Sequence, residues 1–278
     1  GAGGFLGSRI CEYYSNRDGY EAVGVTHREL DIEDFVAVSA FIKAIRPDYV
    51  LHCAAISNTG TCERNPVLSE KVNVRGTINL AKACRNAGSR MIFTSSDQIY
   101  NTSHSLEPNR EGSEGKPGNV YGRDKKRAEE AMLTYLPDAV ALRLTWMYDA
   151  PSRGRAAGQG LLQKLADALK DRREVEFPVH DYRGITYVWE VVRHLEEAMG
   201  LPGGVYNFGS ENRYNTFDTA RLFLRELAGS DSGGILKRND ERFASCPRNL
   251  TMDTDKIKSY RIRFFNTSEG IRKCCMEH

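Results

Sequence analysis

The chain has 278 residues and a formal net charge of +2 at pH 7, from 39 basic and 37 acidic residues. This near balance argues against the electrostatic footprint of a nucleic-acid-binding protein, and no apolar run reaches the roughly 20 residues needed to span a bilayer. Seven cysteines, an odd number without zinc spacing, predict reduced thiols, no metal site and a cytoplasmic location. We expect the adjacent Cys274 and Cys275 to lie in an exposed tail.

The first 150 residues alternate between strand and helix patterns. Short apolar runs predict strands over residues 21–26, 49–55, 90–94 and 139–144. Apolar positions at helical spacing predict helices over residues 8–17, 35–45, 66–87 and 121–135. Such alternation is typical of βαβ units, so we expect an α/β fold with a doubly wound parallel sheet of the Rossmann type.

After residue 150 the pattern is less regular. It predicts helices over 161–170, 187–199 and 216–227, strands over 174–179 and 205–208, and a mobile loop over 151–160. We therefore expect two domains. Residues 1–150 form the doubly wound domain, and residues 151–278 form a smaller, mixed α/β lobe from which some segments return to the first domain.

A glycine-rich loop opens the chain. Residues 1–7 read Gly-Ala-Gly-Gly-Phe-Leu-Gly, with glycines at positions 1, 4 and 7. Without side chains, the backbone N–H groups of such a loop can approach a pyrophosphate, and the following helix points its positive end at that charge. The loop predicts a dinucleotide site, although glycine clusters are often plain turns. Because a strand normally precedes such a loop, we expect the first strand of the sheet to be missing from the sequence.

Three side chains form a candidate catalytic set. Tyr121 stands one helical turn before Lys125, and Ser96 follows the strand at 90–94, at the end of the sheet where ligands of this fold bind. A phenol can protonate a carbonyl oxygen, and a hydroxyl can orient that oxygen. The ammonium of Lys125 would favour the phenolate and bond to a cofactor ribose. The alternative is a surface Tyr–Lys pair and a turn serine.

The choice of cofactor depends on the end of the strand predicted at 21–26. Nicotinamide enzymes that use NAD usually place an acidic residue there, on the ribose hydroxyls. This chain has Thr26, His27 and Arg28. A guanidinium suits a 2′-phosphate, so we expect NADP(H) to be preferred, with NAD(H) possible. The alternative for Arg28 is a solvated loop charge.

Five motifs together resemble the extended short-chain dehydrogenase/reductase superfamily, and the match runs the length of the chain. They lie at residues 1–7, 52–55, 72–77, 94–100 and 121–125. Within the superfamily, the chain looks most like the branch of dTDP-4-dehydrorhamnose reductases, because of the segments 28–32, 46–50, 142–148 and 253–256. One departure is the stretch 181–187, which is nearer that of sugar-nucleotide epimerases.

The resemblance implies an NAD(P)H-dependent reductase of a keto-deoxysugar nucleotide, with Ser96, Tyr121 and Lys125 as catalytic residues. The cofactor residues would be Tyr121 and Lys125 together with Gly1, Gly3, Gly4, Phe5, Leu6, Gly7, Arg28, Asp31, Ile32, Cys53, Ala54, Ala55 and Asn73. The substrate would meet Ser96, Asp97, Tyr121, Trp146 and Arg183.

Alternatives remain open at this point. The same site serves epimerases and dehydratases, and the resemblance extends to the regulatory β-subunit of methionine adenosyltransferase, a non-catalytic NADP-binding protein. We expect a small nucleotide sugar as partner, no nucleic acid and no membrane, and leave a homodimer open. The intact set of Ser96, Tyr121 and Lys125 favours the enzyme.

Overall fold

The computed structural model describes residues 1–105, 107–150, 160–229 and 234–277. The loop expected over 151–160 therefore lies outside the described residues, apart from Gly160. The chain folds into two compact units. The first unit comprises Gly1–Asn101, Glu114–Arg143 and His194–Tyr206, and the second comprises Thr102–Ser113, Leu144–Arg193 and Asn207–His278.

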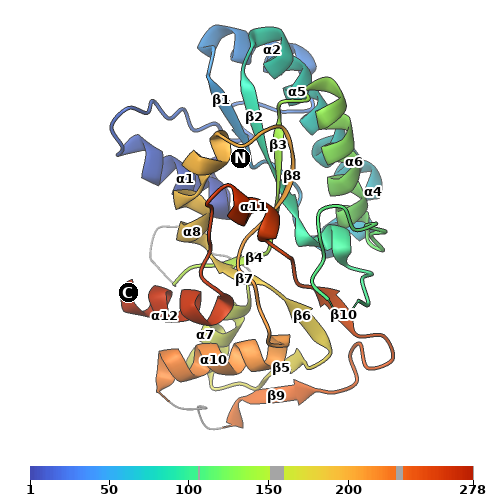
Figure 1. Cartoon of the computed structure of the whole chain (residues 1–278), viewed down its shortest axis with the longest axis vertical. Helices are drawn as coiled ribbons and strands as arrows, with labels where there is room; N and C mark the ends of the chain where they lie inside the picture. The colour runs from blue at the N-terminus through green and yellow to red at the C-terminus, as the bar shows by residue number, and fades with distance from the viewer. Residues whose placement is uncertain (106, 151–159, 230–233, 278) are drawn as a thin grey trace. The chain divides into compact units, whose positions relative to one another are not determined.

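The first unit is built on a four-stranded sheet (Figure 1). Its strands follow the order β1 (Tyr49–His52), β2 (Arg90–Ser96), β3 (Val140–Leu144) and β8 (Gly204–Phe208). Strands β1 and β2 are parallel, with Tyr49 opposite Arg90. The sheet is accompanied by α1 (Phe5–Ser15), α2 (Phe35–Ile45), α3 (Thr59–Arg64), α4 (Pro66–Glu70), α5 (Gly76–Ala87), α6 (Val120–Tyr135) and α9 (Leu195–Met199). The expected α/β fold with parallel strands is confirmed.

Apolar faces of the helices and strands form the core of this unit. Residues of α2, α5 and α6 pack with β2 and β3, and they include Val38, Ile42, Leu80, Met91, Phe93, Met132 and Ala141. Helix α2 starts at Phe35, as its sequence predicts, because the Asp34 carboxylate accepts hydrogen bonds from the N–H groups of Val36 and Ala37. The helix predicted over 66–87 is continuous but contains a wider π-turn at Lys71–Arg75.

The strand predicted over 21–26 is wrong. These residues form no strand, although Val25 O accepts hydrogen bonds from Gly1 N at 2.9 Å and Ala2 N at 3.1 Å. A strand needs hydrogen bonds to a neighbouring strand along its length. Among the described residues, this segment has such backbone bonds only at Val25. Its apolar Val23 is accordingly half exposed, at 50%.

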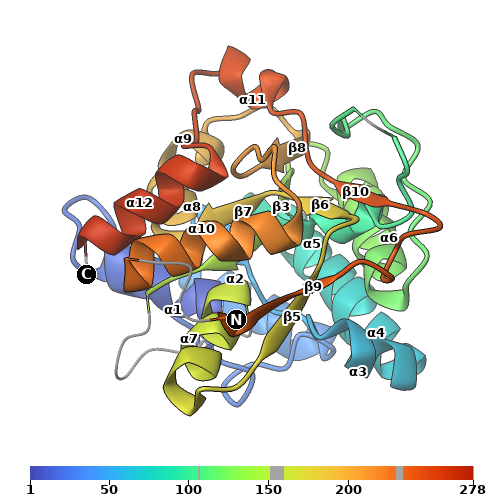
Figure 2. The same cartoon turned by 90° about the horizontal axis from the view of Figure 1, so that it is seen from below.

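The second unit contains three parallel strand pairs. They are β4 (Trp146–Tyr148) with β7 (Ile185–Tyr187), β5 (Val175–Pro178) with β9 (Leu236–Asn239), and β6 (Asp181–Arg183) with β10 (Arg248–Leu250). The helices of this unit are α7 (Leu161–Asp171), α8 (Val188–Arg193), α10 (Thr216–Ala228), α11 (Asp255–Ser259) and α12 (Thr267–Glu277). Helices α10 and α12 pack side by side (Figure 2).

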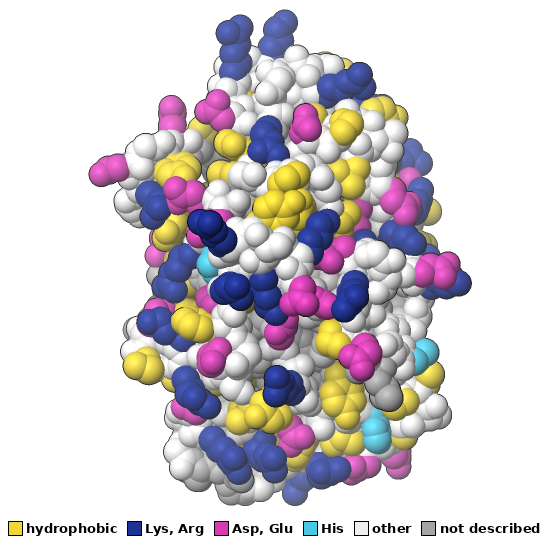
Figure 3. Space-filling view, in the orientation of Figure 1, with side chains coloured by type: hydrophobic (Ala, Val, Ile, Leu, Met, Phe, Trp, Pro, Cys, Tyr) yellow, Lys and Arg dark blue, Asp and Glu magenta, His cyan; other side chains and the backbone are white. Residues whose placement is uncertain are grey.

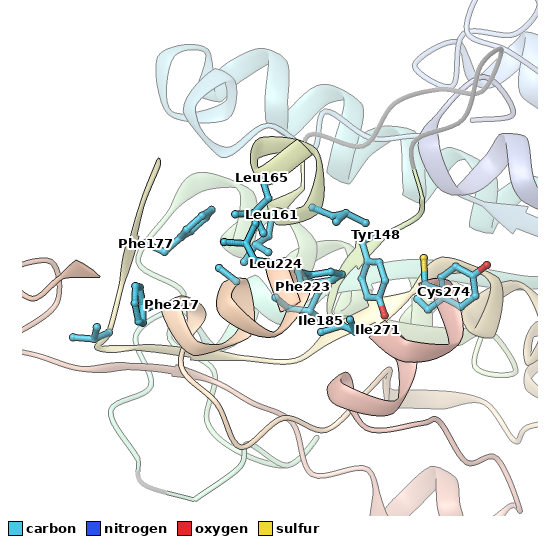
Figure 4. Close-up of a cluster of buried hydrophobic side chains, with 14 residues drawn as sticks. Tyr148, Leu161, Leu165, Phe177, Ile185, Phe217, Phe223, Leu224, Ile271 and Cys274 are labelled. Atoms are coloured by element: carbon cyan, nitrogen blue, oxygen red, sulfur yellow. The ribbon is translucent and has the colours of Figure 1, made fainter. Parts of the chain in front are cut away.

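A buried apolar cluster holds the second unit together (Figure 4). Its members come from α7, α10, α12 and the neighbouring strands, and include Tyr148, Leu161, Leu165, Phe177, Phe223 and Ile271. Cys274 belongs to this cluster and is only 2% exposed. The expectation of an exposed tail is therefore wrong for Cys274, because the tail forms α12 and Cys274 lies on its buried face.

The surface mixes charges, in keeping with the near-neutral composition. On the face in Figure 3, basic and acidic side chains are interspersed. Among the described residues, no helix is both long and apolar enough to cross a membrane.

Glu190 of α8 should make the second unit less stable as pH rises. One carboxylate oxygen accepts the Phe265 N–H at 2.9 Å, whereas the other is buried and finds no hydrogen-bond partner among the described residues. Burial raises the pKa of Glu190 from 4.5 to about 7, with Arg193 opposing this shift and Glu269 and Glu277 adding to it. The folded state therefore binds the extra proton between these two pH values, so stability falls as pH rises across them and stays lower above pH 7.

We expect Glu190→Gln to remove this dependence. At pH 8 the variant should be more stable than wild type by about 2–3 kcal/mol, and near pH 4.5 the two should be similar. Urea unfolding at both pH values measures the difference. A difference that does not change with pH would show that Glu190 is not the titrating group.

Candidate active site

The glycine loop packs too closely for side chains at two of its positions. A Cβ on Gly1 would lie 2.6 Å from Ala54 N, in the segment that follows β1. A Cβ on Gly7 would lie 2.9 Å from the carbonyl carbon of Gly1. Gly1 and Gly7 therefore let the loop pack against the end of β1 and the first turn of α1. A Cβ on the exposed Gly3 would meet only Thr26 Cγ2, at 3.8 Å, so this side of the loop is open.

Asn73 holds the segment that follows β1. Its side chain accepts a hydrogen bond from Ile56 N at 2.8 Å and donates to Ile56 O at 3.1 Å and to Ser69 Oγ at 3.2 Å. Ser69 in turn donates to Asp124 of α6 at 2.6 Å. The predicted cofactor residue Asn73 thus positions the backbone next to Ala54 and Ala55. Sequence reasoning missed Ser69 and Asp124, because no local pattern shows that they pair.

The segment that carries the expected cofactor residues Asp31 and Ile32 is held in place by α5. A Cβ on Gly76 would lie 2.6 Å from Ile32 Cδ1, and Asn79 Nδ2 donates to Ile32 O at 2.9 Å. Asp31 accepts the Glu33 N–H at 2.9 Å, and Arg28 is exposed to solvent. Ile32 is therefore held in place, whereas the guanidinium of Arg28 remains accessible to a ligand.

Ser96 and Tyr121 come together because α6 approaches the end of β2 closely. Asn119 caps α6 by accepting the Gly122 N–H at 2.7 Å. A Cβ on Gly122 would lie 2.8 Å from Pro117 Cβ and would also clash with the Gln98 carbonyl, so only glycine permits this approach. The hydroxyl of Ser96 then lies close enough to the Tyr121 phenol to lower the pKa of that phenol.

Lys125 is fully buried one turn after Tyr121. Its Nζ donates to Thr94 O at 2.7 Å and lies 5.7 Å from the centre of the Tyr121 ring. Burial lowers the pKa of Lys125 to about 8. Burial also raises the pKa of Tyr121 above its usual value, Ser96 partly opposes this, and Asp97 adds to it. Tyr121 therefore keeps its proton at neutral pH, as a general acid must.

A buried ion pair anchors α6 to β3. Arg143 Nη2 donates to Glu129 Oε2 at 2.7 Å and Arg143 Nε donates to Glu129 Oε1 at 3.0 Å. Arg143 Nη1 also donates to the Tyr100 hydroxyl at 2.6 Å. Both charged side chains are at most 7% exposed. The pair holds the helix that carries Tyr121 and Lys125, and no sequence spacing pointed to it.

The expected substrate residues lie in both units. Asp97, in the first unit, is buried beside Ser96 and accepts a hydrogen bond from its hydroxyl at 3.2 Å. In the second unit, the guanidinium of Arg183 lies 4.8 Å from the centre of the Trp146 ring. In the same unit, Arg248 Nε pairs with Asp181 Oδ1 at 2.8 Å. No group of three or more potential metal ligands occurs within the described ranges.

The parallel sheet, the glycine loop and the Ser96–Tyr121–Lys125 set define a Rossmann-type protein of the extended short-chain dehydrogenase/reductase class. The family model described as "RmlD substrate binding domain" matches residues 1–277, and the chain belongs to this family. Both the expected superfamily and the expected branch are thereby confirmed.

The chain is similar to curated proteins of more than one kind. The chain is 30% identical over 241 residues to a dTDP-4-dehydrorhamnose reductase of Mycolicibacterium smegmatis, covering 83% of this chain and 68% of that protein. It is 26% identical over 275 residues to methionine adenosyltransferase 2 subunit beta of Xenopus laevis, covering 94% of this chain and 81% of that protein.

Solved structures share the fold. The dTDP-4-dehydrorhamnose reductase of Bacillus anthracis in complex with NADP has a TM-score of 0.88 at 21% identity, over 100% of this chain and 97% of that one. The UDP-glucose 4-epimerase of Thermotoga maritima has a TM-score of 0.80 at 22% identity, over 99% of this chain and 96% of that one.

Proposed function

We propose that the chain is an NADPH-dependent reductase of a dTDP-linked 4-keto-6-deoxysugar. The observation that carries this proposal is a buried, protonated Tyr121 with Ser96 beside it and Lys125 one turn away. Relatives named dTDP-4-dehydrorhamnose reductase and dTDP-4-keto-6-deoxy-D-glucose reductase support the choice of substrate. We assign the cofactor site to the first unit. We assign most of the binding site for the sugar nucleotide to the second unit.

The residues present fit a nicotinamide dinucleotide. The open side of the loop at Gly3 leaves backbone N–H groups accessible for a pyrophosphate, and Arg28 is exposed for a 2′-phosphate. When bound, the nicotinamide supplies the hydride that reduces the sugar carbonyl carbon. Ser96 donates a hydrogen bond to the carbonyl oxygen, and Tyr121 transfers its proton to that oxygen as negative charge develops there. Lys125 holds the ribose hydroxyls and keeps Tyr121 in position.

A panel of keto sugar nucleotides tests the function. With NADPH, the full chain should consume dTDP-4-dehydrorhamnose, measured as loss of absorbance of the reduced nicotinamide. Turnover should be slower with UDP-linked keto sugars. Tight NADPH binding without turnover on any member of the panel would contradict the reductase.

Arg28→Ala should change cofactor preference. Loss of the guanidinium should weaken NADPH binding about tenfold and leave NADH nearly unchanged, because only NADPH carries the 2′-phosphate. Calorimetry with both cofactors measures this, and Lys43→Ala removes an exposed charge elsewhere in the first unit as a control. Equal weakening of both cofactors would show that Arg28 does not meet the phosphate.

Arg183→Ala should weaken binding of the nucleotide sugar. A guanidinium held on the Trp146 ring can pair with diphosphate oxygens, so inhibition by dTDP should weaken about 10- to 100-fold. Arg221→Ala, which removes an exposed charge in the same unit, should have no such effect. If dTDP inhibits both variants equally, the diphosphate does not bind at Arg183.

One observation favours a second function, that of a regulatory subunit. The similarity to methionine adenosyltransferase 2 subunit beta extends over 94% of the chain. A protein of this kind would bind NADP without turnover, and substitution of Tyr121 would then have no kinetic consequence. An epimerase or dehydratase would instead return its bound cofactor unchanged after each cycle.

A further inference from the structure

The Glu29 side chain folds back onto the residue at which cofactor preference is usually decided. The N–H and the Oγ1 of Thr26 both donate to Glu29 Oε2, at 2.7 Å each. The turn is closed by Glu29 N and Leu30 N, which both donate to Thr26 O at 3.1 Å. The two hydrogen bonds from Thr26 hold the pKa of Glu29 below its usual value. Glu29 is therefore an anion at neutral pH, and it is exposed.

Thr26 lies beside the glycine loop. Its Cγ2 would be 3.8 Å from a Cβ on Gly3, and the preceding Val25 O accepts the N–H groups of Gly1 and Ala2. In a dinucleotide fold, the adenosine ribose lies next to this loop, at the residues that follow the second strand. The sequence shows no acidic residue at positions 26–28, yet the turn brings a carboxylate to the same place.

We propose that Glu29 determines how strongly the chain prefers NADPH over NADH; this proposal rests on the nicotinamide cofactor proposed above. A 2′-phosphate carries a charge of about −1.5 to −2 and accepts hydrogen bonds. Glu29 repels it and occupies the two Thr26 donors that the phosphate needs. The ribose hydroxyls of NADH can instead donate to the carboxylate. Glu29 thus opposes Arg28, and the balance between the two charges sets the preference.

The bond pattern also has a purely structural explanation. Thr-x-x-Glu with the glutamate bonded to the threonine N–H is a capping box, which stabilises a turn whatever ligand binds. Glu29→Gln separates the two explanations. The amide oxygen can still accept from Thr26, so the turn is retained, whereas the negative charge is lost. A structural role predicts no change in the relative affinities of the two cofactors.

The test measures Kd for NADPH and NADH with the full chain, by quenching of protein fluorescence. In Glu29→Gln the ratio Kd(NADH)/Kd(NADPH) should rise about tenfold over wild type, because a repulsion felt only by the 2′-phosphate has been removed. Glu33→Gln, which removes a nearby charge from the same segment, should leave the ratio within about twofold. Thr26→Val, which keeps the charge but loses a donor, should lower the ratio.

The outcomes that overturn the proposal can be told apart from failure of the proposed function. If both cofactors bind and the ratio in Glu29→Gln matches that in Glu33→Gln, Glu29 has only the structural role and the nicotinamide site stands. If wild type binds neither cofactor, the proposed function fails together with this inference. Thermal unfolding of each variant without cofactor checks that the turn and the unit are intact.

Discussion

Replacing Tyr121 by phenylalanine should lower kcat about 10²- to 10⁴-fold, while Kd for NADPH stays within about twofold. The phenol is buried beside Ser96 and protonated at neutral pH, so its proton is available to the alkoxide formed by reduction. The ring packs near Lys125, and phenylalanine preserves that packing. Steady-state kinetics with dTDP-4-dehydrorhamnose, together with cofactor titration, separate the two effects.

Tyr135→Phe is the matched control, because Tyr135 ends the same helix and its ring centre lies 4.7 Å from the Lys82 ammonium nitrogen. Its turnover should match wild type. Near wild-type turnover in Tyr121→Phe would remove Tyr121 from the proton transfer. It would leave the cofactor site intact and would favour the regulatory function.

Arg143→Leu should lower the free energy of unfolding by about 3–5 kcal/mol. The substitution leaves the Glu129 carboxylate buried without its partner and also removes the donor to Tyr100, and an unpaired buried charge carries a penalty of this size. Urea unfolding measures the loss. Because the pair anchors α6, the variant should also lose activity at temperatures where it is still folded.

Two comparisons make this result specific. Arg143→Leu combined with Glu129→Leu should recover most of the lost stability, since the unpaired charge is gone. Arg17→Leu breaks an exposed ion pair with Glu196 and should cost less than about 1 kcal/mol. An equally small loss in Arg143→Leu would mean that the buried pair does not stabilise α6.

The sequence predicts those helices and strands whose pattern of apolar residues is visible within the element itself. Helix α2 has the predicted bounds because both its apolar spacing and its Asp34 cap are encoded within a few residues. Strands β1, β2 and β3 are short apolar runs, and each lies within about three residues of its predicted ends. The strand predicted over 21–26 is wrong because a strand depends on a neighbour, which local sequence does not reveal.

Contacts between distant residues could not be predicted. The short strands β6 and β10 pair across more than sixty residues, and neither shows a periodic pattern of its own. In the candidate site, the Tyr-x-x-x-Lys spacing and the position of Ser96 are local signals, so the sequence alone predicts these residues as candidates. The fold-back of Glu29 and the bonds of Asn73 depend on backbone geometry, which residue types alone do not reveal.

Transfer of an isotopic label tests the central claim most directly. The full chain would be mixed in a single turnover with NADPH carrying deuterium at both C4 positions and with dTDP-4-dehydrorhamnose, and the sugar product analysed by mass spectrometry. We predict one deuterium on the carbon that carried the keto group, with one NADP⁺ formed per sugar reduced, and a transfer about 10²- to 10⁴-fold slower in Tyr121→Phe. NADPH that binds but leaves no deuterium in the sugar would contradict the reductase.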